Sequence, residues 1–211
     1  MATNDRVYSL VHMVLTVYPK VIRPVILRYV QQQVTAVDTS GSALDNFLYR
    51  NRAIVFQSTI GEDRQDVFFP RNEESDIEQW DVHMLVWFIL NVCPDLDEDV
   101  RAAGQRLHNL SEDILNVLND TNEQSRFVEI MKRDIQTCLK FIQDNNLTKT
   151  ITKEIDEMGS SQPGQYLSNP DELHKWHNAA KKVKDRFKDT RGKLHYAFIG
   201  MYVTMMASQL L

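Results

Sequence analysis

The sequence predicts an all-α protein, a helical bundle followed by a C-terminal helical extension. Apolar residues recur every three or four positions in most segments, which is the spacing of helices with one buried face. Seven Gly and six Pro are few for 211 residues, so a β-rich or loop-rich architecture is not expected. A hydrophobic content of 43% is typical of a globular chain with a sizeable core.

The N-terminal part predicts two or three helices. Residues 7–34 follow a helical apolar pattern, which Pro19 and Pro24 interrupt. Because proline removes a helical hydrogen bond, we expect two helices or one kinked helix here. A loop at 38–42 precedes a shorter helix, expected from 45 to 55.

The middle of the chain predicts a central helix. Residues 61–72 are expected to form an irregular connection. Ser75 and Glu78 have the spacing of a capping box, in which two side chains satisfy free amides at a helix start. The helix after them, from 77 to 92, is the most apolar of the first half, and Pro94 ends it. It is therefore expected near the centre of the bundle.

Four further helices are expected between the central helix and the linker that follows residue 158. Asp97 can cap a helix that runs to residue 108, and Ser111 can start a short one. A second capping box at 121–124 predicts a long helix to about residue 144. A weaker helix is expected from 148 to 158. The long helix carries one apolar stripe, which consists of Phe127, Ile130, Met131, Ile135, Leu139 and Ile142.

The bundle is expected to span residues 1–147 and the extension residues 148–211. A linker rich in Ser, Gly and Pro is expected at 159–168. The order Asn-Pro-Asp then predicts a helix from 170 to 190, with Asn as its cap. The last helix, 193–211, is nearly all apolar.

Charge divides the chain into two parts. The net charge is −5, but residues 174–194 carry eight basic and two acidic residues, which leaves −11 for the remainder. The basic segment could bind RNA phosphates or an anionic surface. A solvated helix face is the favoured alternative, because only Trp176 and Phe187 supply interleaved aromatic rings. The candidate binding residues are Lys175, Lys181, Lys182, Lys184, Arg186, Lys188 and Arg191.

The cysteines favour a reducing compartment. Cys93 and Cys138 each lie in an apolar helical pattern, so a disulfide scaffold is not expected, although the two could pair if both lie on core faces. The first residues also lack the order of a secretory signal. We therefore expect a cytoplasmic location.

Neither a metal, a cofactor nor a membrane is an expected partner. His174 and His177 have metal-ligand spacing, with Asp171 nearby, but a strong third ligand is missing from the sequence around them. Residues 194–211 are long enough for a marginal membrane span, but His195 and other polar residues disfavour it. A buried helix or a self-association face is expected instead.

The segment from Arg101 to His108 contains the candidate catalytic residues. Arginine can stabilise phosphoryl charge, and histidine can act as a general acid or base near neutral pH. Seven residues apart on one helix, the two lie on the same side. An amphipathic helix with solvated charges and a hydrogen-bonded histidine explains the same pattern and is the favoured interpretation of the residues alone.

Three motifs follow one another in the middle of the chain. They are Phe68-Phe69-Pro70, Trp80-Asp81-Val82-His83-Met84-Leu85 and Ile89-Leu90-Asn91-Val92-Cys93-Pro94. In this order they resemble the HEPN domain (higher eukaryotes and prokaryotes nucleotide-binding), of the type found in the DAZ-interacting zinc-finger ubiquitin ligase. The resemblance covers residues 10–145. It implies an all-α bundle, often homodimeric, and a link to ubiquitin ligation or innate immunity.

The resemblance also implies roles for the Arg…His segment. In active relatives this motif from two protomers meets across the dimer and cleaves RNA without a metal. Here His108 would be the acid or base and Arg101 the phosphate-binding residue. Six residues separate them, and Ala102 follows Arg101 where the family usually has a polar residue.

These departures favour a non-catalytic binding and dimerisation module. Its expected partners are a second copy, single-stranded RNA or another protein. A metal-independent endoribonuclease that uses Arg101 and His108 is the alternative, and attachment to a membrane surface through the basic and apolar tail is a third hypothesis.

Overall fold

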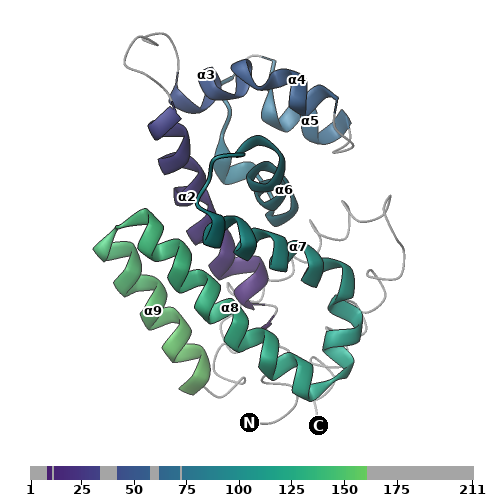
Figure 1. Ribbon diagram of the computed structural model, residues 1–211, viewed down its shortest axis with the longest axis vertical. Coiled ribbons are helices and arrows are strands. Elements are labelled where there is room, and N and C mark those ends of the chain that lie inside the picture. The colour runs from purple at the N-terminus through teal and green to yellow at the C-terminus, as the bar shows by residue number, and fades with distance from the viewer. Residues whose placement is uncertain (1–8, 11, 34–41, 58–61, 72, 161–211) are drawn as a thin grey trace.

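The described part of the protein is helical throughout. The structure is a computed structural model, and it describes residues 9–10, 12–33, 42–57, 62–71 and 73–160 (Figure 1). Within these ranges it contains helices and turns and no strand, so the all-α prediction is confirmed. The elements are η1 (Met13–Val17), α2 (Tyr18–Gln33), α3 (Ala43–Arg50), α4 (Arg52–Phe56), α5 (Glu62–Phe68), η2 (Ile77–Gln79), α6 (Val82–Val92), α7 (Glu98–Asn119), α8 (Thr121–Ile142) and α9 (Asn145–Ser160).

Helix α2 runs through the middle of the molecule and packs against α3, α6 and α8 (Figure 1). Helix α7 lies between α6 and α8. Helices α3, α4 and α5 form one end, and α8 and α9 run side by side at the other. The predicted central helix is α6, whose Met84, Phe88 and Ile89 are fully buried.

The N-terminal helical run is continuous across both prolines. The π-helical turn η1 ends directly before α2, and the Tyr18 amide donates to the Met13 carbonyl. Pro19 is the second residue of α2, and its ring would crowd the carbonyl four residues earlier in a regular α-helix. We infer that the wider turn accommodates this ring. Pro24 lies inside α2, so one irregular helix replaces the two that the prolines allowed.

The prediction of an irregular segment at 61–72 was wrong, because α5 occupies most of it. Charged and amide side chains fill the first five positions of α5, and this polarity obscures the helical pattern in the sequence. Phe68 at its end is fully buried and packs edge-on against Trp80, with ring centroids 4.6 Å apart. Burial of this one ring anchors the short helix to the core.

The predicted capping box at Ser75 was also wrong. The Ser75 hydroxyl donates to the carbonyl of Phe68, and its amide donates to Asp45 Oδ1 at 2.9 Å. Helix α6 starts five residues later than predicted, with Asp81 as its cap, whose Oδ1 accepts from the Met84 amide at 2.7 Å. Trp80 lies between the predicted start at residue 77 and the observed start at residue 82. Its backbone is extended and its side chain is buried.

Arg23 of α2 explains why the chain breaks before α6. Its guanidinium donates to the carbonyls of Ile77, Glu78 and Trp80 at 3.0–3.2 Å. These carbonyls would otherwise accept amides of a continuing helix. The contact therefore stabilises the 3₁₀ turn and leaves Asp81 to start α6.

Asp97 and Asp120 cap the next two helices, α7 and α8. Asp97 caps α7 as predicted, and its Oδ1 accepts the Val100 amide at 3.1 Å. The predicted break at Ser111 is absent from the described backbone, where α7 continues to residue 119. Asp120 caps α8 instead of Thr121, and Oδ1 of Asp120 accepts the Asn122 amide at 2.8 Å.

Helix α8 ends close to the prediction, and α9 follows at once. Gln143 adopts a left-handed conformation with φ of 59°, which terminates α8. The Asp144 carboxylate then accepts the Asn146 amide at 2.8 Å and caps α9. The two asparagines at 145–146, which follow the predicted helix end at about residue 144, begin the next helix.

Helix α9 belongs to the same core as the preceding helices. Its Ile151 is fully buried and Met158 nearly so. The expected boundary at residue 147 therefore falls inside a helix that packs on the bundle. The rest of the expected linker beyond residue 160, the basic helix 170–190 and the apolar helix 193–211 lie outside the described residues.

Glu154 ties α9 to the N-terminal helical run. One carboxylate oxygen lies 3.1 Å from His12 Nε2, and Lys20 Nζ donates to both oxygens at 2.8 and 2.9 Å. The hydrogen bond from His12 and the contacts with Lys20 lower the pKa of Glu154 to about 2 despite its partial burial. The unfolded carboxyl group has a higher pKa, so this stabilisation is present above about pH 4.5 and is lost as the pH falls toward 2.

Glu154→Gln is therefore expected to reduce the free energy of unfolding at pH 7 by about 1–2 kcal/mol, an amount discounted for the exposure of Lys20. The difference from the wild type should shrink progressively between pH 5 and pH 2. Urea denaturation at a series of pH values measures it. Glu157→Gln is the matched control, because Glu157 lies on the same helix and forms an exposed pair with Lys153 at 3.6 Å. A Glu154 effect that does not vary with pH would contradict this role.

Candidate functional site

The segment from Arg101 to His108 lies against α6. Ala103 and Leu107 are buried. A Cβ atom added at Gly104 would lie 3.3 Å from Cγ2 of Ile89, so the absence of a side chain lets the two helices approach closely there. The segment is therefore a packing surface between α6 and α7.

Arg101 caps the C-terminal end of α6. Its Nη2 donates to the Leu90 carbonyl at 2.9 Å, and its Nη1 donates to those of Pro94 at 3.1 Å and Cys93 at 3.4 Å. The last carbonyls of a helix lack intrahelical partners, and a cation is favourable beside them. The guanidinium therefore satisfies backbone groups that Pro94 leaves without a following turn.

His108 lies at the opposite end of α6. Its ring faces that of His83 in the first turn of α6, with centroids 6.4 Å apart. His108 is seven positions after Arg101, which is about 10 Å along α7. The structure thus places both candidates on the α6 side of α7, but in two different environments.

A cluster of ionisable groups surrounds His83. Burial is the largest cause that lowers the pKa of His83, followed by Arg64, and then His108, while Asp81 opposes them. Arg64 Nε lies 4.0 Å from Asp81 Oδ2. The groups come from α5, α6 and α7, and the lowered pKa favours the neutral imidazole of His83 at pH 7.

The sequence did not identify His83 or Arg64 as site residues. His83 stands inside one of the motifs that resemble the HEPN domain, but its position gave no reason to pair it with His108. The pairing follows from the antiparallel packing of α6 and α7. Two facing imidazoles could serve as acid and base, or as a proton-dependent contact between helices.

The two cysteine thiols lie in other parts of the core. Cys93 and Cys138 are buried and free, so the alternative of a disulfide between them is not realised. Burial raises the pKa of Cys138 to about 12 and that of Cys93 further, so both stay protonated at neutral pH. Among the described residues, no three His, Cys, Asp or Glu side chains gather closely enough to hold a metal ion.

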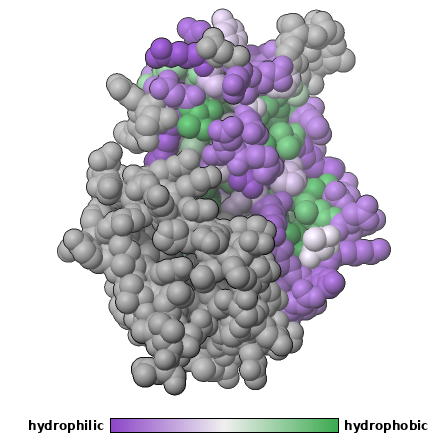
Figure 2. Space-filling model, turned by 180° about the vertical axis from the view of Figure 1, so that it is seen from behind, coloured by the Kyte–Doolittle hydropathy of each residue, from purple (hydrophilic) through white to green (hydrophobic). Residues whose placement is uncertain are grey.

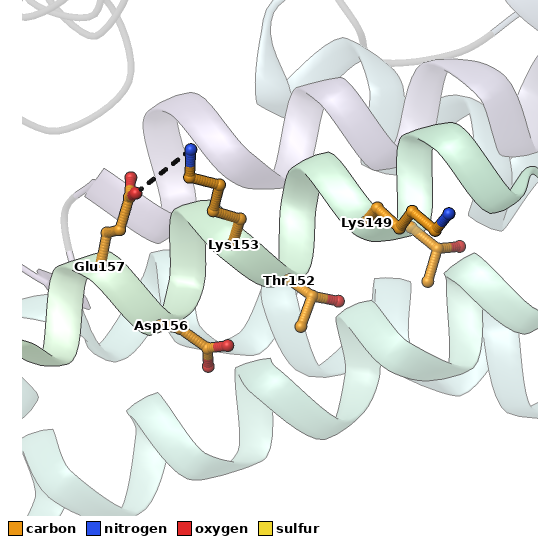
Figure 3. Close-up of a pocket in the computed structure, with 6 residues that line it drawn as sticks. Lys149, Thr152, Lys153, Asp156 and Glu157 are labelled. Atoms are coloured by element: carbon orange, nitrogen blue, oxygen red, sulfur yellow. Dashed lines mark ion pairs between the residues drawn. The ribbon is translucent and has the colours of Figure 1, made fainter.

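An open hollow lies along the outer side of α9 (Figure 3). Its lining residues are hydroxyl-bearing or charged, with both signs of charge, and one ion pair joins Lys153 and Glu157 at 3.6 Å. Mixed charges on one exposed helix face are typical of a solvated surface. The lining residues are Thr148, Lys149, Thr152, Lys153, Asp156 and Glu157.

An exposed apolar surface lies on α3 and α4. Tyr49, Ile54 and Phe56 are 67%, 40% and 55% exposed, and they are the large hydrophobic residues that the described part of the chain leaves exposed. Phe56 stacks on Phe69 with centroids 5.2 Å apart. Arg52 lies over the Tyr49 ring at 5.3 Å. We call these five residues the α3–α4 surface.

The α3–α4 surface lies at the end of the molecule formed by α3, α4 and α5, where hydrophobic residues lie among hydrophilic ones (Figure 2). The sequence predicted a single helix at 45–55, whereas the chain breaks at Asn51 between α3, which carries Tyr49, and α4, which carries Arg52 and Phe56.

No family model, curated protein or solved structure matches this chain. The basic residues from Lys175 to Arg191, proposed to bind RNA or an anionic surface, lie outside the described part of the chain. Within the described part, none of the helices is both long and apolar enough to cross a membrane.

Proposed function

We propose that this chain is a non-catalytic binding and self-association module with RNA or a second protein as its partner. The observation that carries the proposal is that Arg101 caps the C-terminal end of α6. A phosphate-binding arginine must present its N–H donors to the substrate, whereas three carbonyls at the end of α6 accept hydrogen bonds from Arg101. Binding phosphate would compete with the capping of a buried central helix. The resemblance to the HEPN domain supports an immune-linked or ubiquitin-linked role in the cytoplasm.

The proposal predicts that the pure protein does not cleave RNA. Single-stranded RNA would be incubated with the full chain at high protein concentration in EDTA, beside His108→Ala, and the products separated on a denaturing gel. Equal, background-level degradation in both samples is expected. EDTA-resistant cleavage that disappears in His108→Ala would overturn the proposal.

A metal-independent endoribonuclease is the second candidate, and the facing of His83 and His108 favours it. Two imidazoles close to one another could divide the roles of acid and base, with Arg64 as the nearby cation. In that case cleavage would be lost in both His83→Ala and His108→Ala. It would survive Arg101→Lys, which keeps the charge at the end of α6. Loss of cleavage in Arg101→Lys alone would instead show that Arg101 binds the phosphate of the RNA.

A further inference from the structure

Ionisable side chains from three helices meet at the start of α6. His83 lies in the first turn of α6, the ring of His108 on α7 faces it, and Arg64 approaches from α5. The side chain of Arg64 is 13% exposed, and its Nε lies 4.0 Å from the carboxylate of Asp81. Both histidines are half-buried. We call Arg64, Asp81, His83 and His108 the α6 cluster, whose charges are only partly screened by water.

The charge of the α6 cluster depends on its two imidazoles. With both imidazoles neutral, the positive charge of Arg64 is balanced by the negative charge of Asp81. A proton on His83 leaves a surplus positive charge beside Arg64 and at the positive end of the α6 dipole. A further proton on His108 would place a second cation in a ring whose centroid is 6.4 Å away. At this separation near a protein surface, the repulsion between two cations changes an equilibrium constant at least tenfold.

The folded chain holds the pKa of His83 below its ordinary value of 6.5. Burial is the largest cause and the positive charge of Arg64 is the next, while the carboxylate of Asp81 opposes both. A group whose pKa is depressed by folding stabilises the fold above its unfolded pKa, and this stability is lost as the pH falls through the folded value. The packing of α5 and α7 on the start of α6 is therefore expected to be tightest above about pH 6.5 and to weaken below it.

Charged groups on the other helices that pack on α6 contact different partners. Arg23 of α2 donates to backbone carbonyls before α6 and pairs with the Glu78 carboxylate at 3.2 Å. Arg52 of α4 lies over the ring of Tyr49, and Arg101 of α7 caps the far end of α6. Within the described part of the chain, the charges that shift the titration of the α6 cluster therefore belong to the cluster itself.

We propose that the α6 cluster is a proton-controlled joint, in which protonation of His83 separates the start of α6 from α5 and α7. This inference goes beyond the proposed function, because it concerns a change of conformation and involves no partner. Opening the joint would uncover aromatic rings that the closed joint buries. Phe68 at the end of α5 packs on Trp80, which lies directly before the Asp81 cap. Acidification would therefore expose an apolar surface at one end of the molecule.

The end of the molecule formed by α8 and α9 should not respond in the same pH range. Glu154 ties α9 to the N-terminal helical run, and its contacts with His12 and Lys20 stabilise the fold above about pH 4.5. Between pH 7.5 and pH 5.5, loosening is therefore expected in α5, at the start of α6 and in the facing turn of α7. The packing of α9 should persist, which separates a local opening from a general loss of stability.

Amide hydrogen exchange of the full chain at pH 7.5 and pH 5.5 tests the proposal, with each rate compared with the intrinsic rate at that pH to give a protection factor. The amides of Met84 and Leu85 donate to the side chain and the carbonyl of Asp81, so they report on the start of α6. The amide of Phe69 donates to the carbonyl of Gln65 and reports on α5. These protection factors should fall at least tenfold at pH 5.5, whereas those of α9 should stay constant.

Three substitutions identify the titrating group. His83→Gln removes the imidazole but keeps a polar side chain, so its protection factors at the two pH values should be equal. His12→Gln is the matched control and should keep the tenfold fall, since Nε2 of His12 lies 3.1 Å from the Glu154 carboxylate, away from the α6 cluster. Arg64→Gln should raise the pKa of His83, measured by NMR titration of its ring protons, because the neighbouring cation is removed.

Equal protection factors at both pH values in the wild type would overturn the proposal. So would a fall that persists in His83→Gln, or a fall of the same size in α9. The NMR titration of the wild type keeps the test valid if His83→Gln unfolds, since a His83 pKa at or above 6.5 in the folded chain would reject the joint. None of these measurements involves RNA, so the joint and the proposed function can fail separately.

Discussion

Replacing Arg106 by alanine is expected to lower the free energy of unfolding by about 3–4 kcal/mol. Arg106 on α7 forms a bidentate ion pair with Asp134 on α8, with Nη2–Oδ1 and Nε–Oδ2 distances of 2.6 and 2.9 Å. Asp134 is only 1% exposed, so the substitution would leave a buried carboxylate without its partner. Urea denaturation followed by circular dichroism measures the change.

A double variant separates the ion pair from the packing around it. Arg106→Met with Asp134→Leu removes both charges and keeps most of the volume, so its stability should lie within about 1 kcal/mol of the wild type. Arg133→Ala, one residue from Asp134 but exposed, is the control and should change little. If Arg106→Ala lowers the free energy of unfolding by less than about 1 kcal/mol, the ion pair with Asp134 does not explain the arginine at this position.

Arg106 belongs to the Arg…His segment. Its three basic side chains contact three parts of the protein: the end of α6, the middle of α8 and the first turn of α6, through Arg101, Arg106 and His108 respectively. All three contacts join α7 to a neighbouring helix. The segment that most resembles a nuclease motif in the sequence is thus the segment that holds the centre of the bundle together.

The sequence predicted the helices well where apolar spacing was strong and a clear stop followed. Helix α6 ends at Val92, two residues before Pro94, and the apolar stripe of α8 faces the core through Met131, Ile135 and Leu139, as expected. The helix starts were predicted less well. Ser75 and Thr121 each had the right spacing for a cap, but Asp81 and Asp120 perform it. Several capping residues stand close together in this chain, so local spacing alone could not choose among them.

Tertiary contacts determine where these helices start and which side chains meet. The start of α6 is decided by the burial of Trp80 and by Arg23, which lies more than fifty residues earlier in the chain. The hydrogen-bond partners of Arg101 are backbone carbonyls. Because every residue has a carbonyl, no residue pattern could predict which ones Arg101 would contact. The same holds for His83 and His108, whose facing depends on how closely α6 and α7 pack at Gly104.

Arg101→Met is expected to lower the free energy of unfolding by about 2–3 kcal/mol, the second-largest effect. The methionine preserves most of the packing but removes the charged donors from the carbonyls of Leu90 and Pro94. Arg101→Lys should recover part of the loss, because lysine keeps the charge beside the helix end but lacks the planar fork that reaches several carbonyls. Urea denaturation gives the magnitude, and amide hydrogen exchange should show faster opening in α6.

His108→Gln is the matched comparison, since it changes the other candidate on the same face of α7. It should cost less than about 1 kcal/mol, because His108 packs against the half-buried ring of His83, whereas Arg101 donates to backbone carbonyls. Equal stability of Arg101→Met and the wild type would show that the guanidinium is dispensable for α6 and free to bind phosphate. A loss of stability in Arg101→Met with no RNA cleavage in any variant would make the cap the reason for an arginine at this position.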